Sequence, residues 1–312
     1  MSSIVERGVN PYRDNVQGKA NEPITVAGLL DRAEQILDVE VPDHSLEDIY
    51  DRLEENAPRI AVIGGSPDHP AHILDLETVL KAAVRIWQRG GVPFHFSVPV
   101  LCDGTAQNNL GMSYSLQSRN AIANIVVNQM EAHAYHSAYV VSGCDKTPFG
   151  ILAGLVHLDR TRQRRGDAPV FAAFHPSHVL RGGTIPPDLM ADLEAVARRA
   201  EAQGHPEIAF DLRDATRYIL QCIANSAFQG VLTRARQEGI VSAAEHKEYE
   251  RRLAVHTCDR KGGICAFTGT GNSNRHALAA LGLAHPAVEL LTEPPDAEQI
   301  NRVVDDLFTI VN

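Results

Sequence analysis

The chain has 312 residues, of which 44% are hydrophobic, which suits a soluble globular protein with a sizeable core. Its 29 basic and 39 acidic residues give a formal net charge of −10, which argues against a nucleic-acid partner. No apolar run reaches membrane-spanning length, and the first residues lack the apolar core of a signal peptide, so we expect no membrane association.

The N-terminal region, residues 1–57, predicts a polar extended arm followed by two helices near 26–36 and 46–56. Ser45 is a suitable N-cap for the second helix. We expect this region to precede the main domain rather than to carry its chemistry.

The main domain is expected to span residues 58–292, where short apolar runs alternate with helical patterns. The expected strands are 59–63, 94–101, 138–142 and 169–174, and the expected helices are 73–89, 118–132, 149–158 and 273–281. Such alternation predicts an α/β fold with a doubly wound, mostly parallel sheet flanked by helices.

Residues 188–253 break this alternation. They are rich in Ala, Arg and Glu, follow a helical pattern and contain no clear strand, which predicts a helical insertion. Residues 293–312 predict a polar turn and one amphipathic helix near 297–310.

The five cysteines are Cys102, Cys144, Cys222, Cys258 and Cys265. They are too few and too scattered for a disulfide scaffold, so we expect reduced thiols in the cytoplasm and metal ligation as a use for some of them. Cys222 lies in an apolar helical pattern and predicts a core position. Cys258 has no CxxC partner, which gives a zinc-ribbon site little support.

The motif Gly143-Cys144-Asp145-Lys146 closes a buried-strand pattern and carries the strongest local signal. Its side chains fall at the carboxyl end of a strand, where open α/β sheets place their chemistry. A soft ligand beside a hard one indicates an iron–sulfur or zinc centre next to a magnesium-type ion. A buried structural cysteine beside a surface Asp–Lys pair is the alternative.

Two further segments repeat this pattern. An apolar run ends in Cys102-Asp103-Gly104, although such a segment alone is more often a turn than a ligand pair. Cys265 stands in a Gly-, Thr- and Asn-rich loop that leads into a helix, a setting that suits anionic groups. His72 follows the first strand, Ser177 the fourth, and Thr270 and Asn272 lie in the Gly-rich loop, so we take these four as candidate substrate contacts.

Taken together, the motifs resemble the dihydroxy-acid and sugar-acid dehydratases, which include the 6-phosphogluconate dehydratases. The resemblance covers roughly residues 58–292, and the sugar-acid branch is the more similar one. Besides the three cysteine motifs, it rests on Gly111-Met112-x-Tyr114-Ser115-Leu116-x-Ser118-Arg119, on Asn272-Ser273-Asn274 and on Ala280-Leu281-Gly282-Leu283-x-x-Pro286.

The resemblance implies a set of ligands and catalytic groups. Cys144 and Cys265, with Cys102 as the best third candidate, match ligands of an iron–sulfur cluster of the 2Fe–2S or 4Fe–4S type. Asp103 and Asp145 match Mg²⁺ ligands. Lys146 matches a lysine that can be carbamylated into a further ligand, and Lys146 and Asp145 are the expected catalytic residues. Together these groups imply removal of water from a 2,3-dihydroxy or sugar acid.

Three departures from the family pattern bear on this expectation. Gly65-Ser66-Pro67-Asp68-His69 stands where many members have a further cysteine, and Phe174–His178 replaces a Gly-Pro loop. The sequence ends at Asn312, without the second domain that in the family supplies another metal-binding glutamate and the proposed base.

We therefore expect a subunit of a split iron–sulfur and Mg²⁺-dependent hydro-lyase, a hetero-oligomer in which a second subunit carries the missing domain. The substrate would be a small hydroxy acid. The alternative is a non-catalytic iron–sulfur binding or regulatory protein derived from the same family.

Overall fold

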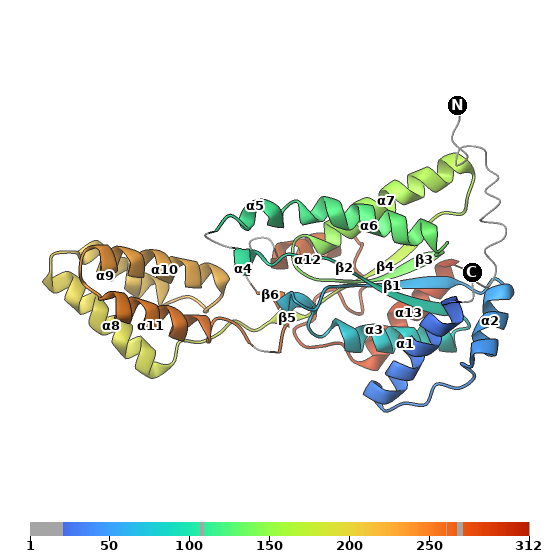
Figure 1. Ribbon diagram of the computed structural model, residues 1–312, viewed down its shortest axis with the longest axis horizontal. Coiled ribbons are helices and arrows are strands. Elements are labelled where there is room, and N and C mark those ends of the chain that lie inside the picture. Colours follow the sequence, from blue (N-terminus) through green and yellow to red (C-terminus); the bar gives the residue numbers. More distant parts are fainter. Residues whose placement is uncertain (1–20, 107–108, 260, 267–270, 312) are drawn as a thin grey trace.

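The computed structural model describes residues 21–106, 109–259, 261–266 and 271–311. Within them, a four-stranded parallel sheet has the strand order β2-β1-β3-β4 and is flanked by helices, so the predicted α/β fold is confirmed (Figure 1). The strands are β1 (Arg59–Gly65), β2 (Val92–Val98), β3 (Ser137–Ser142) and β4 (Phe171–Pro176). The predicted arm over residues 1–20 lies outside the described residues.

The sheet buries both faces because successive side chains of each strand point to opposite sides. Ile60 and Val62 of β1 pack with α3 (Asp75–Gln88) and α13 (Ala297–Val311) on one face. Ala61 and Ile63 face the other side, which is covered by α6 (Ser118–Ala132), α7 (Thr147–Arg165) and α12 (Gly271–Ala280). Every residue of β1 is therefore buried.

Two helices at the N-terminal side complete this body. Helix α1 (Asn21–Leu37) packs on α3 and β2, and α2 (Leu46–Glu54) packs on α1 and β2. The predicted N-cap Ser45 is confirmed: its hydroxyl accepts from the Asp48 backbone N–H, and the Asp48 carboxylate accepts from the Ser45 N–H.

Some predicted boundaries were wrong for local reasons. Strand β2 ends at Val98 rather than residue 101, because Pro99 has no N–H to continue the ladder. Helix α7 runs beyond the predicted residue 158 and ends at Arg165, because the next residue, Gly166, adopts a left-handed conformation with φ 77°. Two short helices, α4 (Asp103–Ala106) and α5 (Met112–Ser115), were not predicted.

Four helices of the described chain, with a core of their own, lie in the region for which the sequence predicts a helical insertion. They are α8 (Pro187–Ala202), α9 (Pro206–Ala215), α10 (Cys222–Gln237) and α11 (Ala243–Ala254). In Figure 1 they lie beyond the end of the sheet at which α4 is found. They join the body near a two-stranded ladder of β5 (Val179–Leu180) and β6 (Ile264–Cys265).

The chain segments that enter and leave the insertion are bonded to each other and to the loop between α9 and α10; we call these three segments the neck. Gly182 pairs with Cys258, and Gly183 pairs with Leu220, both in antiparallel bridges. The Gly183 N–H donates to the Leu220 carbonyl at 2.8 Å, and the Leu220 N–H returns the bond at 3.0 Å. The neck therefore holds the insertion directly beside the strand ends.

Candidate functional site

The turn from β3 into α7 carries the most strongly predicted motif. Gly143 and Cys144 follow the last residue of β3, and Asp145 and Lys146 directly precede the first residue of α7. Strand β3 pairs with β1, and β1 also pairs with β2, so the chain reverses its winding between β1 and β3. The carboxyl ends of strands beside such a reversal form the usual ligand crevice of open α/β sheets.

Lys146 is fully buried between two carboxylates at this edge. Its Nζ lies 2.6 Å from Asp103 Oδ1 and 2.8 Å from Asp145 Oδ1. Asp103 is the first residue of α4, so two segments more than forty positions apart in sequence meet at one ammonium. The Ser115 hydroxyl donates a further short hydrogen bond to Asp103 Oδ1.

The charges of this group are mutually compensated. Burial alone would raise the pKa of Asp145, but hydrogen bonds from Lys146 and Cys144 outweigh it and lower the pKa below its ordinary value. Burial would lower the pKa of Lys146, but Cys144, Asp103 and Asp145 raise it. The buried Lys146 ammonium is thus paired with two carboxylates, so its charge is not left uncompensated inside the protein.

The Cys144 thiol belongs to the same group. It donates to Asp145 Oδ1 at 3.0 Å and lies 3.8 Å from Lys146 Nζ. Burial, together with the Asp145 charge, raises the pKa of Cys144. Its backbone has φ 63°, the left-handed region that a non-glycine residue seldom adopts and that costs on the order of 1 kcal/mol. Strain of this kind collects at functional sites.

His72 holds the loop after β1 in place through both nitrogen atoms of its ring. The His72 Nδ1 lies 2.5 Å from Asp75 Oδ2, and its Nε2 lies 3.1 Å from Thr147 Oγ1. Asp75 Oδ2 also accepts the Gly65 N–H at 3.0 Å. Since both ring nitrogens are bonded inside the protein, the structure gives His72 a positioning role, and its predicted contact with substrate stays a prediction.

Several buried polar atoms around the strand ends have no hydrogen-bond partner in the described structure. They are Nε2 of His69, Oγ of Ser142, Oγ of Ser177 and Oδ1 of Asn272. Such atoms usually find a partner, so each is available to a polar ligand. A cavity of about 20 Å³, room for one water molecule, is lined in part by Asp75, Ser177 and His178.

The structure describes some of the predicted substrate contacts but not all of them. Ser177 and Asn272 lie close to the strand ends, and the Asn274 side chain donates to the Asp145 carbonyl at 3.1 Å, which joins the start of α12 to the β3 turn. Thr270 lies outside the described residues.

Among the cysteines, the prediction for Cys222 was wrong. Helix α10 begins at Cys222 instead of passing through it, and the side chain is half-buried rather than part of the core. It faces the segment that carries Cys102. Sequence spacing gave no sign of this, because the neck brings together residues more than a hundred positions apart.

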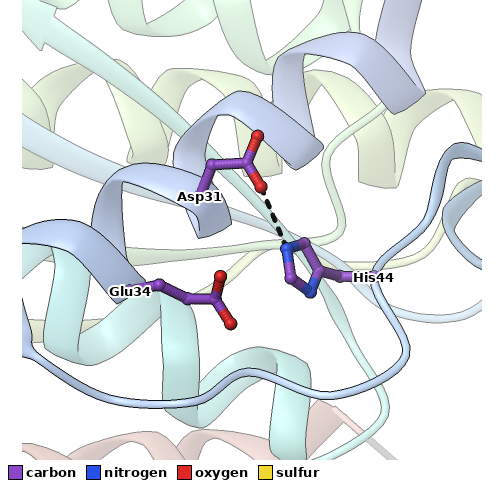
Figure 2. Close-up of side chains that lie close together, drawn as sticks. All are labelled: Asp31, Glu34 and His44. Atoms are coloured by element: carbon purple, nitrogen blue, oxygen red, sulfur yellow. Dashed lines mark hydrogen bonds and ion pairs between the residues drawn. The ribbon is translucent and has the colours of Figure 1, made fainter.

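Another possible ligand group consists of Asp31, Glu34 and His44, from α1 and the loop that follows it (Figure 2). His44 pairs with Asp31 at 3.0 Å, and Glu34 accepts the Val41 N–H at 2.8 Å. These bonds close the loop between α1 and α2. This structural role is sufficient to explain why the three partly exposed side chains lie together.

Comparison with known proteins identifies the central part of the chain. Residues 57–162 match the family described as dihydroxy-acid/6-phosphogluconate dehydratase, N-terminal. The segment contains Cys102, Asp103, Cys144, Asp145 and Lys146, whereas Cys265, Asn272 and the insertion fall outside it.

Individual dehydratases agree with this match. The chain is 36% identical over 116 residues to a dihydroxy-acid dehydratase of Sulfurisphaera tokodaii, covering 37% of this chain and 18% of the relative. It is 38% identical over 111 residues to the enzyme of that name from Thermodesulfovibrio yellowstonii, covering 35% and 20%. With the protein from Syntrophobacter fumaroxidans, identity is 33% over 151 residues, covering 47% and 25%. The matched part therefore spans at most about a quarter of these relatives.

The donor sets of the dehydratase segment suit the metals that the resemblance implies. Asp103 and Asp145 offer hard carboxylate oxygen atoms, the type of ligand that Mg²⁺ prefers. Cysteine thiols beside them offer soft ligands for iron. No helix in the described part of the chain is long and apolar enough to cross a membrane.

Proposed function

We propose that this chain contributes the metal-binding half of a hydro-lyase that removes water from a 2,3-dihydroxy or sugar acid. The observation that carries the proposal is the burial of the Lys146 ammonium between Asp103 and Asp145, at the winding reversal of a sheet whose central segment matches the dehydratase family.

Asp103 and Asp145 would hold Mg²⁺ with Lys146, and Cys102, Cys144 and Cys265 would hold an iron–sulfur cluster. When bound, these metals supply chelation of the substrate carboxylate with its neighbouring oxygen, and Lewis-acid activation of the departing hydroxyl. Because the thiols must stay reduced, we assign the protein to the cytoplasm.

The chain's own residues then bind and orient the substrate. The unpartnered atoms of Ser142, Ser177 and Asn272 supply hydrogen-bonding capacity at the strand ends. Lys146 and Asp145 set the charge of the site at which the substrate carboxylate binds. Burial of both side chains excludes water from them and strengthens these interactions.

We further propose that a second subunit completes the site. The matched segments span only 18% to 25% of the relatives quoted above, and a further carboxylate and the proton-abstracting group would come from the partner. The chain alone is then inactive on such acids.

The test is reconstitution. The full chain is purified without oxygen, and water loss from a 2,3-dihydroxy carboxylate and from a six-carbon sugar acid is assayed with and without a polypeptide that carries the remaining length of a dehydratase relative. Activity should appear only in the mixture and should be lost in Lys146→Met and Asp145→Asn. Turnover by the chain alone contradicts the split arrangement; a metal-loaded mixture inactive on both acids favours the non-catalytic binding protein.

A further inference from the structure

His69 lies in the loop after β1 and directly precedes the short helix η2 (Pro70–His72). This helix contacts two of the segments that carry the predicted motifs. The carbonyl of its first residue accepts the Gly263 N–H at 2.9 Å, just before β6. A Cβ added at Gly143, in the turn after β3, would lie 2.8 Å from Ala71 Cβ. These contacts hold the residue before η2 at the edge of the sheet where β1 and β3 end.

The His69 ring has a nitrogen atom that the protein leaves unpaired. The residue is 5% exposed, and among the described residues its Nε2 has no hydrogen-bond partner. In His72, by contrast, both ring nitrogens are bonded, to Asp75 and to Thr147. The two histidine rings meet edge to face with their centroids 5.6 Å apart. An unpaired buried polar group costs about 1–3 kcal/mol, and a ligand that pairs with it recovers this cost.

The other ring nitrogen decides which atom of His69 carries the proton. The Nδ1 atom lies 3.0 Å from the Ala71 backbone nitrogen. Because a backbone N–H can only donate, Nδ1 accepts this bond with its lone pair. A neutral imidazole has a single N–H, which is then on Nε2. The unpaired atom is therefore a hydrogen-bond donor.

Burial keeps the ring in this neutral form. Together with the charges of His72 and Lys146, it lowers the pKa of His69 from 6.5 to about 3. The other unpartnered atoms named above for the strand ends are oxygen atoms of Ser142, Ser177 and Asn272. Within this group, His69 is the residue that offers a nitrogen-bound proton in a direction fixed by its own ring.

This tautomer does not suit metal binding through Nε2. A metal ion needs the lone pair of that atom, so the proton would have to move to Nδ1. There it would face the Ala71 N–H, and two donors would meet at 3.0 Å. A ligand oxygen, by contrast, accepts from Nε2 with the proton where it already lies.

We propose that His69 is a substrate-binding residue whose Nε2–H donates to an oxygen atom of the hydroxy acid. The inference rests on the proposed function for the class of ligand, whereas the donor itself rests on the contacts of His69. A site that hydrogen-bonds a substrate group discriminates strongly against analogues without that group, because the protein group is then left unpaired. His69 would thus help to select the acid.

Two substitutions separate this role from a structural one. His69→Asn places an amide oxygen near the position of Nδ1, so it keeps an acceptor for the Ala71 N–H and deletes only the Nε2–H; Asn is also favourable at a helix N-cap. His69→Gln reaches the position of Nε2 with its amide nitrogen but loses the acceptor at Nδ1.

The experiment measures binding of D-gluconate and of D-glycerate to the full-length chain in Mg²⁺ by calorimetry. His69→Asn should weaken binding at least about tenfold, because it loses a hydrogen bond to a charged or polar oxygen. His69→Gln should weaken it by less than about threefold, because a donor remains. Urea unfolding checks the fold, and His69→Asn should be at least as stable as His69→Gln. If His69 served only as the N-cap of η2, His69→Gln would be the weaker binder, and the inference would be overturned.

Long-range proton–nitrogen NMR of histidine-labelled protein gives the tautomer directly. The signals that disappear in His69→Asn should be those of a neutral ring with its proton on Nε2, and that proton should shift when the acid is added. A proton on Nδ1, or wild-type affinity in His69→Asn, would overturn the inference while leaving the proposed dehydratase function intact. Loss of bound iron in His69→Asn after anaerobic reconstitution would assign His69 to the metal centre and overturn it too, as would a wild type that binds neither acid. The proposed function itself fails separately, in the reconstituted activity assay.

Discussion

The His72 imidazole occupies the space that a side chain on Gly65 would need. A Cβ added at Gly65 would lie 2.2 Å from His72 Cδ2, and one added at Gly143 would lie 3.3 Å from His72 Cε1. The ring is therefore held between the last residue of β1 and the residue after β3. Glycine is needed at position 65 because the His72 ring packs against it, whereas a side chain on Gly143 would first meet Ala71 Cβ, at 2.8 Å.

Gly65→Ala should destabilise the fold by about 3 kcal/mol, because the core cannot yield to the added methyl group. His72→Ala removes the obstacle, so Gly65→Ala/His72→Ala should cost at least about 1 kcal/mol less than the sum of the two single changes. Urea unfolding of the three variants measures the coupling. Strictly additive costs would show that the two residues do not compete for the same space.

Cys144 provides a test of backbone strain that is independent of its thiol. Cys144→Ala and Cys144→Gly both remove the sulfur, but only glycine adopts φ 63° without a steric cost. We expect Cys144→Gly to be more stable than Cys144→Ala by about 1 kcal/mol in urea unfolding at neutral pH. Equal stability of the two variants would mean that this turn relaxes when the thiol is lost.

The sequence predicted the sheet because its strands are short apolar runs separated by helical patterns. Two predicted elements lie almost where they were expected: the strand Arg59–Ile63 and the helix Ser118–Ala132. In both, the hydrophobic pattern and the residues that mark the ends of the element indicate the same bounds. The short helices α4 and α5 could not be predicted, because four residues do not establish a helical period. Tertiary contacts, such as the Ser115–Asp103 bond, hold them instead.

The site was predictable to the extent that strand ends mark it. Cys102, Asp103, Cys144 and Asp145 each follow a strand pattern, which indicated a common edge. The roles of Asp75 and Cys222 were not predictable in the same way. In the sequence, Asp75 is an ordinary acidic residue in the first turn of a helix. Its bond to the Gly65 N–H depends on how α3 packs against the sheet.

Protonation of His175 should make stability depend on pH. Its ring is fully buried and lies 2.6 Å from the Tyr139 hydroxyl, and burial, assisted by the charges of His178 and His285, lowers its pKa from 6.5 to about 3. Between these values the unfolded chain binds a proton that the folded one does not, so stability falls as the pH drops from about 6.5 toward 3. Above pH 6.5 the group contributes no pH dependence.

His175→Asn should therefore flatten the pH profile of unfolding. We expect the wild type to lose up to about 1.4 kcal/mol more per pH unit than the variant below pH 6. Urea unfolding at pH 7, 6 and 5 measures this slope. The same slope in both proteins would show that His175 does not carry the effect.

The two carboxylates around Lys146 should bind a hard divalent cation. Asp103→Asn and Asp145→Asn should each weaken Mn²⁺ binding at least about tenfold, because each removes a charged oxygen ligand. Free Mn²⁺, followed by electron paramagnetic resonance, gives the affinity. Asp68→Asn, an exposed aspartate in the loop after β1, is the matched control and should bind as the wild type does. Wild-type affinity in both site variants would place the cation elsewhere.

The neck offers a test of how the insertion is attached. A Cβ added at Gly183 would lie 1.5 Å from the His256 carbonyl oxygen, so Gly183→Ala must move the segments of these two residues apart. The insertion has its own buried core and should stay helical, so we expect little change in far-ultraviolet circular dichroism. Proteolytic cleavage near residues 183–186 and 256–259 should become at least about tenfold faster.

Gly230→Ala is the matched control, because Gly230 lies in α10 and nothing lies within 4 Å of the added Cβ. It should leave cleavage unchanged and stabilise the helix by up to about 1 kcal/mol. Equal cleavage of both variants would mean that the bridges at Gly182 and Gly183 do not hold the insertion in place.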